Sequence, residues 1–596
     1  MDDLTLLRSF EPVVRLTEGE FFVPVGVDAY VRQSALWEQM PDGEARVVAG
    51  PGTIDLAELA ELGARLDGPG QSLSGITVPS SRLARLRGMR ARRPKFRAGA
   101  RLAQVGLLGR SIDTLSRFSL LLRGAVPGGS ATLSLAVQND HLRPDRPVYH
   151  ARVVRDGDWI VCQYWLFYAF NNWRSGFSGV NEHEADWEQV TIYLDGTGLP
   201  GEGHPSHAGP GGDALPVPRW VVFSAHDETG DDLRRRWDDP DLSLVDGRHP
   251  VMFAGAGSHS GAYLAGDYLI TVEPPTLGGA VPTVRRLAKV LMPWTRAAQG
   301  SGFGIPYIDY ARGDGTSIGP GQELAWTPDV IDDDTPWVRD YRGLWGHDTR
   351  DRLGGERGPA GPRYERDGTV RASWGDPIGW AGLAKVAPNP AREQALVTRR
   401  IQEIDAELER LELDTAASRE AMAMRVAGLA PGSPEVRLLE DDERGLLTAR
   451  MTAVRLRDER ERLRRAKRDG VTVADPRAHL RHRRTPIEAS SRGRSWFLNG
   501  WAIISTPLVL WLVSVLLRPN LFARGQMAVG LLVGVLAVEA FARGYLLAFL
   551  GRLLLFLLLL NLIVLFIGNW QLVTAATLAA LAFVILFVNI RDAWRR

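Results

Sequence analysis

The hydrophobic positions change their spacing twice along the chain, and these changes divide it into three parts. Between residues 146 and 388, short apolar runs alternate with Gly-, Pro- and Asp-rich turns, as in β-strands. From 391 to 470, apolar residues recur every three or four positions among many charges, as in helices. After residue 495, long apolar runs predominate. The pattern predicts a multidomain protein with a mainly-β sandwich, a helical coiled-coil hairpin and a C-terminal α-helical transmembrane bundle.

The predicted sandwich consists of short strands rich in Val, Ile, Tyr and Trp. Because no helix-length periodic segment separates them, a sandwich is favoured over βαβ units. The predicted strands are 148–154, 159–167, 187–194, 219–225, 251–254 and 268–272. Residues 1–145 mix strand-like and helix-like signals, and we assign them to the same β domain.

A basic stretch, residues 82–101, lies within that N-terminal segment. It contains nine Arg or Lys residues and no acidic residue. One interpretation is a solvated loop, and another is attraction to an anionic membrane surface, at about 1 kcal/mol per basic residue. No nucleic-acid-binding module surrounds the stretch, and the formal net charge of the chain is only +1. We therefore expect no nucleic-acid partner.

The charged segment 391–470 predicts two helices separated by the Gly/Pro-rich residues 428–434. The first carries a seam at coiled-coil spacing, formed by Val397, Ile401, Ile404, Leu408 and Leu411. The short connection favours an intramolecular antiparallel pair. Dimerisation is the alternative, which leaves a homo-oligomer open.

Residues 495–596 predict a membrane domain. Its four expected spans are 496–517, 527–542, 553–570 and 572–590. A basic juxtamembrane linker (471–494), the turn with Arg543 and Arg552, and the basic tail follow the positive-inside rule. The acidic N-terminus lacks a signal-peptide pattern, and the only cysteine, Cys162, excludes an internal disulfide. We expect a multi-pass integral membrane protein whose large N-terminal part and C-terminal tail are cytoplasmic.

Glu539 lies within the second predicted span, where an acidic side chain is costly. Arg543, one helical turn further on, is the expected partner, because residues four apart lie on the same helix face. The spans otherwise lack the polar residues and broken helices of a transporter. An anchor or an oligomerisation bundle is expected.

The candidate chemistry is concentrated in the acidic run 182–188. If a strand begins at Asp186, the carboxylates of Asp186 and Glu188 leave the backbone on one face, and His183 can fold over to meet them. Two carboxylates and an imidazole could bind a divalent cation. The alternative interpretation is that these residues are solvated loop charges before the strand. The helical zinc-protease motif is excluded, because its second histidine would fall on Trp187. Two more histidines, His226 and His259, follow predicted strands and are the weak candidates for a catalytic role.

Two families resemble this chain. The His-x-x-Asp-Trp-Glu motif in residues 183–188 resembles the heptad of the necrosis-and-ethylene-inducing-peptide-like (NPP1) cytolysins. A broader resemblance, over residues 8–385, is to the vacuolar-protein-sorting protein sixty-two family. The stretches that carry it are 10–14, 19–24, 146–149, 165–168, 249–251, 257–259, 341–346, 358–362 and 374–377.

The resemblance implies a β-sandwich that holds one Ca²⁺ or Mg²⁺ in a surface cleft. Carried over by motif position, the cytolysin ligands fall on His183, Asp186 and Glu188. The second histidine of the heptad is Ala185 here, and the upstream Asp ligand has no clear counterpart. The amide oxygen of Asn171 or Asn172 could take its place. Cytolytic activity is not transferred, because this chain lacks the signal peptide and the disulfide-forming cysteines.

Three functions remain. The first is a membrane-anchored cytoplasmic protein whose cation-binding sandwich recognises a lipid head group or other anionic ligand, in membrane trafficking or envelope organisation. The alternative is a metal-dependent hydrolase of a phosphoester or lipid, with His226 or His259 as general acid or base. The absence of a recognised nucleophile motif favours the non-enzymatic function. A third interpretation is an assembly factor whose sandwich is only a scaffold.

Overall fold

The computed structural model consists of two compact units. The larger unit comprises Met1–Ala98, Leu122–Tyr268 and Ile308–Glu488, and the smaller unit comprises Gly99–Leu121, Leu269–Tyr307 and Ala489–Arg596. The structure describes residues 1–40, 45–66, 70–75, 110, 130–172, 182–197, 215–224, 230–272, 305–348, 357–430, 436–469, 477, 479–480, 483–487, 492–516, 522–542 and 544–594. The basic stretch 82–101 and His226 lie outside these residues.

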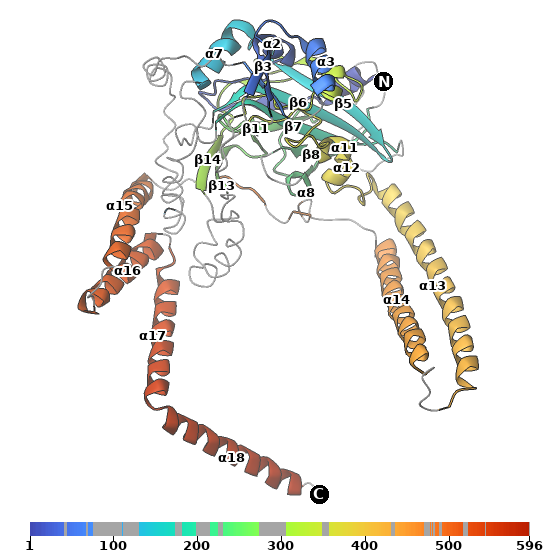
Figure 1. The fold of residues 1–596 in the computed structure, drawn as a ribbon, viewed down its shortest axis with the longest axis vertical. Coiled ribbons are helices and arrows are strands. Elements are labelled where there is room, and N and C mark those ends of the chain that lie inside the picture. The colour runs from blue at the N-terminus through green and yellow to red at the C-terminus, as the bar shows by residue number, and fades with distance from the viewer. Residues whose placement is uncertain are drawn as a thin grey trace. The chain divides into compact units, whose positions relative to one another are not determined.

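A six-stranded sheet forms the centre of the larger unit (Figure 1). Its order is β16 (Thr327–Val330), β5 (Val148–Asp156), β6 (Trp159–Asn171), β7 (His183–Asp195), β8 (Pro218–Phe223) and β9 (Arg235–Arg236). Neighbouring strands from β5 to β9 pair antiparallel, and β16 joins β5 in parallel. Every residue of β7 is buried, including its polar residues Asp186, Glu188 and Gln189.

A second sheet is assembled from distant parts of the chain. Its order is β10 (Leu244–Val245), β11 (His249–Ala254), β1 (Val13–Arg15) and β15 (Ser317–Ile318), and β12 (Gly261–Ala262) also pairs with β11. Smaller sheets pair β13 (Gly266–Val272) with β14 (Ile305–Ala311), and β2 (Ala35–Gln39) with β3 (Ala45–Ala49) and β4 (Gln71–Ser74). The six strands predicted from the sequence correspond to β5, β6, β7, β8, β11 and β13, and are confirmed.

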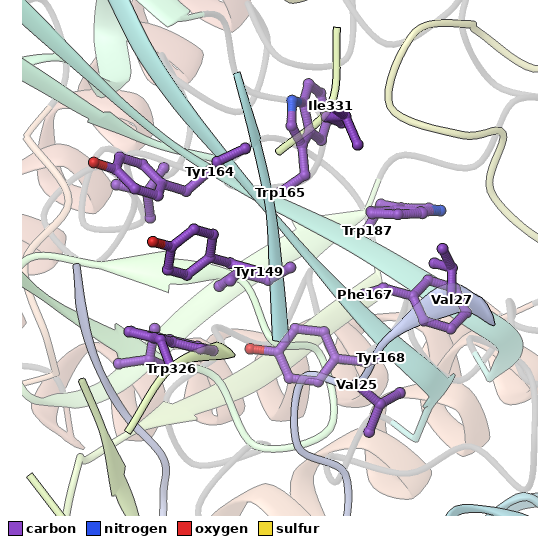
Figure 2. Packing of buried hydrophobic residues seen from close by; sticks show 14 of the residues in the cluster. Val25, Val27, Tyr149, Tyr164, Trp165, Phe167, Tyr168, Trp187, Trp326 and Ile331 are labelled. Carbon is purple, nitrogen blue, oxygen red and sulfur yellow. The ribbon is translucent and has the colours of Figure 1, made fainter. Parts of the chain in front are cut away.

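Both large sheets contribute to one hydrophobic core. Val14, Met252 and Ile318 of the second sheet lie in the same buried cluster as Tyr164 and Trp187 of the first. Figure 2 shows part of this cluster, in which aromatic side chains come from β5 (Tyr149), β6 (Tyr164, Trp165, Phe167 and Tyr168) and β7 (Trp187). The two sheets thus share a core, while the sandwich arrangement stays a prediction.

Short helices surround the sheets. In chain order they are α1 (Asp3–Phe10), α2 (Val27–Gln33), α3 (Leu56–Leu66), α7 (Ser130–His141), α8 (Gly230–Leu233), α10 (Pro336–Asp340), α11 (Ala372–Gly375) and α12 (Pro377–Trp380). The first begins at an Asp2 side chain that accepts a hydrogen bond from the Thr5 N–H, as an N-cap does.

Two long helices, α13 (Pro390–Val426) and α14 (Val436–Asp469), lie side by side (Figure 1). Ile404 and Leu408 of the predicted seam are buried between them, and Arg460 contacts Asp405 at 2.8 Å. Before the first helix, Asn389 donates to Asp195 at the end of β7, at 2.9 Å. The paired helices match the prediction, and the coiled-coil geometry stays a prediction.

The smaller unit contains the C-terminal helices α15 (Arg492–Leu516), α16 (Phe522–Ala542), α17 (Leu546–Gly568) and α18 (Trp570–Trp594). Two segments, Leu546–Gly568 and Trp570–Arg591, are long and apolar enough to cross a membrane. They correspond to the third and fourth predicted spans, although the break between them falls at Asn569. The first two predicted spans coincide with α15 and α16, and their crossing stays a prediction.

Glu539 has buried partners that the local sequence spacing did not suggest. Glu539 accepts hydrogen bonds from Arg110 Nη2 at 2.6 Å and from Trp501 Nε1 at 2.7 Å. Arg110 also donates to Ser505 Oγ at 2.9 Å, and both charged side chains are 2% exposed. Arg543 lies outside the described residues, so its pairing with Glu539 stays a prediction.

Candidate functional site

Asp186 and Glu188 lie on one face of β7, as the alternation of the sequence predicts. Asp186 is paired with Tyr168 and Glu188 with Leu166 on the neighbouring strand β6. The strand begins earlier than predicted, at His183. Both carboxylates are buried, at 5% and 3% exposed, so they belong to the interior and are not solvated loop charges.

Ala185 interrupts the alternation just before these carboxylates. Its φ of 61° lies in the left-handed region, which non-glycine residues rarely adopt. Glu184 therefore reaches different partners from Asp186 and accepts hydrogen bonds from the Gly75 N–H at 2.5 Å and the His347 N–H at 3.2 Å. Burial raises the pKa of Glu184 to about 7, against hydrogen bonds, the largest from Ser74, that lower it. The Glu184 carboxylate thus binds the backbone at Gly75 and His347, and it does not belong to the group of side chains around Asp186.

His259 is the centre of that group. It follows β11 with a φ of 55°, and its Nδ1 lies 2.8 Å from Asp186 Oδ2. Its ring stacks on Tyr168 with centroids 3.8 Å apart, and Nε2 lies 3.8 Å from Glu20 Oε1. Burial lowers the pKa of His259, but its contacts with the carboxylates of Asp186 and Glu20 outweigh this effect and raise the pKa to about 9. The ring is therefore an imidazolium at neutral pH.

Glu20 is held in place by backbone donors. It accepts from the N–H groups of Phe21 at 2.7 Å, Phe22 at 2.9 Å and Gly257 at 2.5 Å. These bonds join the loop after β1 to the loop that carries His259. Such N–H donors stabilise the ionised carboxylate.

Glu188 and Asp309 complete the acidic cluster, which we define as Glu20, Asp186, Glu188, His259 and Asp309. The Ser224 hydroxyl donates to Glu188, and the Ser258 hydroxyl donates to Asp309 at 2.6 Å. Burial and the charge of Asp186 raise the pKa of Glu188 well above its ordinary value. One histidine thus faces four buried carboxyl groups.

Unused hydrogen-bonding atoms surround Asp186. Asn171 Nδ2 donates to Asp186 Oδ2 at 3.0 Å, but Asn171 Oδ1 has no hydrogen-bond partner among the described residues. The Tyr168 hydroxyl and His259 Nε2 also have none in that part of the chain. These three side chains are at most 1% exposed. Buried polar atoms normally have partners, so this arrangement points to a ligand, ion or water among them.

The predicted ligand set is assembled only in part. Asp186 and Glu188 come together, whereas Nδ1 of His183 lies 2.6 Å from the Ala185 carbonyl oxygen. Asn172 directly follows β6, and His226 lies outside the described residues. In the residues that the structure describes, no group of three or more His, Cys, Asp or Glu side chains is arranged to hold a metal ion. Divalent-cation binding stays a prediction.

Sequence reasoning missed Glu20 and Asp309 as members of the cluster and gave His259 only a weak catalytic role. A signal for Glu20 did exist, because it falls within the stretch 19–24 that carried part of the family resemblance.

The chain matches no protein-family model, no curated protein and no solved structure.

The histidine gives a pH-dependent prediction. The pKa of His259 is 6.5 ordinarily and about 9 in the fold, so the folded state binds its proton more tightly. Its contribution is complete below pH 6.5 and disappears as pH rises through 9, for a total loss of about 3 kcal/mol. The raised pKa of Glu188 acts in the same direction. Thermal denaturation of the full chain in detergent between these pH values should show the loss.

The matched variant for this prediction is His259→Asn, which removes the titrating ring. Its stability should change less with pH over the same interval. An equal slope in the variant and the unsubstituted chain would assign the pH dependence to other groups.

Proposed function

We propose that the protein is a membrane-anchored protein whose β domain, built as a two-sheet sandwich, binds one divalent cation. Through that cation it recognises a lipid head group or other anionic ligand. The observation that supports this most is the set of buried oxygens around Asp186, where Glu188 adds a second carboxylate and Asn171 an unused amide oxygen.

The donor chemistry fits a hard cation. Ca²⁺ and Mg²⁺ take carboxylate and amide oxygens as ligands. Asp186, Glu188 and Asn171 are the residues that would hold the ion. Tyr168 pairs with Asp186 across the two strands, and its hydroxyl has no hydrogen-bond partner among the described residues. A bound cation would supply a positive charge that attracts an anion and offsets the repulsion between the carboxylates.

The membrane part of the proposal rests on the two long apolar segments and the distribution of basic residues. We place four spans in the bilayer, with the β domain and the tail on the cytoplasmic side, by the positive-inside rule. The resemblance to the vacuolar-protein-sorting protein sixty-two family supports a role in trafficking or envelope organisation. An anionic ligand in the adjacent leaflet would then lie within reach of the β domain.

The hydrolase alternative has less support. A general base must be unprotonated at neutral pH, whereas the contacts with Asp186 and Glu20 hold His259 as an imidazolium. The ring is 0% exposed and stacked on Tyr168. His259 is therefore better suited to neutralising carboxylates than to accepting a substrate proton.

A thermal-shift measurement tests cation binding. Added Ca²⁺ or Mg²⁺ should raise the melting temperature of the purified full chain, since a ligand at 100 times its Kd stabilises the folded state by about 2.7 kcal/mol. Glu188→Gln should lose most of this gain. Glu184→Gln is the matched control, because Glu184 lies on the same strand but its carboxylate binds Gly75 and His347.

Anion recognition is tested next, with soluble glycerophosphoserine as the probe. It should stabilise the unsubstituted chain further when the cation is present, and have no effect on Glu188→Gln. A melting temperature that no divalent cation raises would refute the cation site. Anion stabilisation that persists without the cation would refute the bridging role.

A further inference from the structure

The chain that follows α14 is attached to the larger unit by arginines. We call residues 477–487 the basic strap, of which 477, 479–480 and 483–487 are described. Arg477 donates to Asp239 Oδ1 at 3.0 Å and to Asp241 Oδ1 at 2.7 Å. Arg483 donates to both carboxylate oxygens of Asp241, each at 2.7 Å. One carboxylate therefore holds both arginines, so the predicted juxtamembrane linker is partly bound to the β domain.

The two sides of this contact differ in exposure. The side chains of Asp239 and Asp241 are 0% and 7% exposed, whereas those of Arg477 and Arg483 are 27% and 41% exposed. The Asp241 N–H also donates to Asp239 Oδ1 at 2.9 Å, which fixes the two carboxylates relative to each other. With the strap bound, the two aspartates are thus enclosed, whereas the arginines of the strap stay partly at the surface.

Two weaker contacts extend the attachment along the strap. The His479 ring meets Trp220 edge-on at 5.0 Å, and its Nε2 lies 3.1 Å from the Arg234 carbonyl oxygen. Further on, the Ile487 N–H donates to the Asp267 carbonyl at 2.7 Å. The strap is therefore in contact with the domain at several points along its length.

An anionic membrane surface offers the same arginines another partner. Residues 477–494 contain six arginines and one acidic residue, and the apolar helix α15 begins at Arg492. A basic residue beside an anionic leaflet is attracted to it. The hydrogen bonds of Arg477 and Arg483 are weakened by the partial exposure of both side chains, so anionic lipid can compete for these arginines.

We propose that Asp239 and Asp241 form a latch that holds the basic strap on the β domain, and that anionic lipid head groups compete with the latch for Arg477 and Arg483. The strap is bound to the domain beside a neutral membrane and moves to the lipid surface beside an anionic one. This switch is independent of the cation site, since the acidic cluster shares no residue with it.

Cysteine labelling of the full chain follows the position of the strap. The only native cysteine, Cys162, is 0% exposed, so Leu480→Cys provides the reporter. In nanodiscs of phosphatidylcholine, a water-soluble maleimide should label this cysteine slowly. Adding phosphatidylserine or phosphatidylglycerol should raise the rate several-fold, and high salt should abolish the effect of the anionic lipid.

Variants of the latch distinguish release of the strap from a general destabilisation of the domain. Asp241→Asn should raise labelling about tenfold in phosphatidylcholine alone, equivalent to about 1.4 kcal/mol. Asp238→Asn is the matched control, because Asp238 pairs with Arg236 at 2.6 Å, is 49% exposed and does not contact the strap arginines. Arg483→Gln should reproduce the rise from the strap side, which keeps the test valid if Asp241→Asn fails to fold.

The proposal is overturned by equal labelling rates in neutral and anionic nanodiscs. It is also overturned if Asp241→Asn and Arg483→Gln label no faster than Asp238→Asn. A rise with phosphatidylserine but not with phosphatidylglycerol would contradict the competition by charge, because both lipids are anionic.

Discussion

Replacement of Asp186 by alanine is expected to lower the free energy of unfolding by about 3–5 kcal/mol, the cost of leaving a buried charge without its partner. The change removes the acceptor of both His259 Nδ1 and Asn171 Nδ2, and His259 is 0% exposed. The pKa of His259 should fall, so the loss of stability between pH 6.5 and 9 should also diminish. Thermal denaturation of the full chain at several pH values measures both effects.

The chain contains a matched control in a second His–Asp contact. His150 Nδ1 lies 2.6 Å from Asp329 Oδ2, but the Asp329 side chain is 46% exposed. Asp329→Ala should therefore cost about 1 kcal/mol or less. A similar cost for both aspartates would show that burial of the acidic cluster does not govern its energetics.

The second large effect is expected in the smaller unit. Glu539→Gln should destabilise the smaller unit by about 3–5 kcal/mol, because Arg110 stays charged while its buried partner becomes neutral. The Trp501 indole donates to the same carboxylate, at 2.7 Å, so tryptophan fluorescence of the full chain in detergent reports the change.

Two further variants test whether the charge pair is the cause. Arg110→Met combined with Glu539→Leu removes both buried charges and should recover most of the stability. Arg552→Met, at an exposed arginine of α17, should have little effect. If the double variant is no more stable than Glu539→Gln, the loss comes from packing and not from the unpaired charge.

Sequence periodicity predicted the strands of the site and the common face of Asp186 and Glu188. It did so because alternation along a buried strand is a local property. The left-handed backbone of Ala185 left no such signal, since alanine has no preference for a positive φ. The extension of the strand back to His183, and the bonds of the Glu184 carboxylate to Gly75 and His347, were therefore not predicted.

The contacts that complete the site could not be predicted, because they join distant segments. Asp186 and His259 are 73 residues apart, and Glu20 and Gly257 are 237 apart. The same holds for Arg110 and Glu539, which are 429 residues apart. Pairings of this kind depend on tertiary packing and not on any pattern within one segment.

The cap of α13 has a mechanical consequence. Asn389 donates to Asp195 at 2.9 Å and to Thr197 at 2.8 Å, and it accepts from the Arg392 N–H at 2.8 Å. The helix is thereby fixed to the far end of β7, whose 13 residues extend about 40 Å. A force applied to the helix pair would therefore be transmitted to β7 at Asp195. Because Asp186 lies on the same strand, movement of the helices would be coupled to the site.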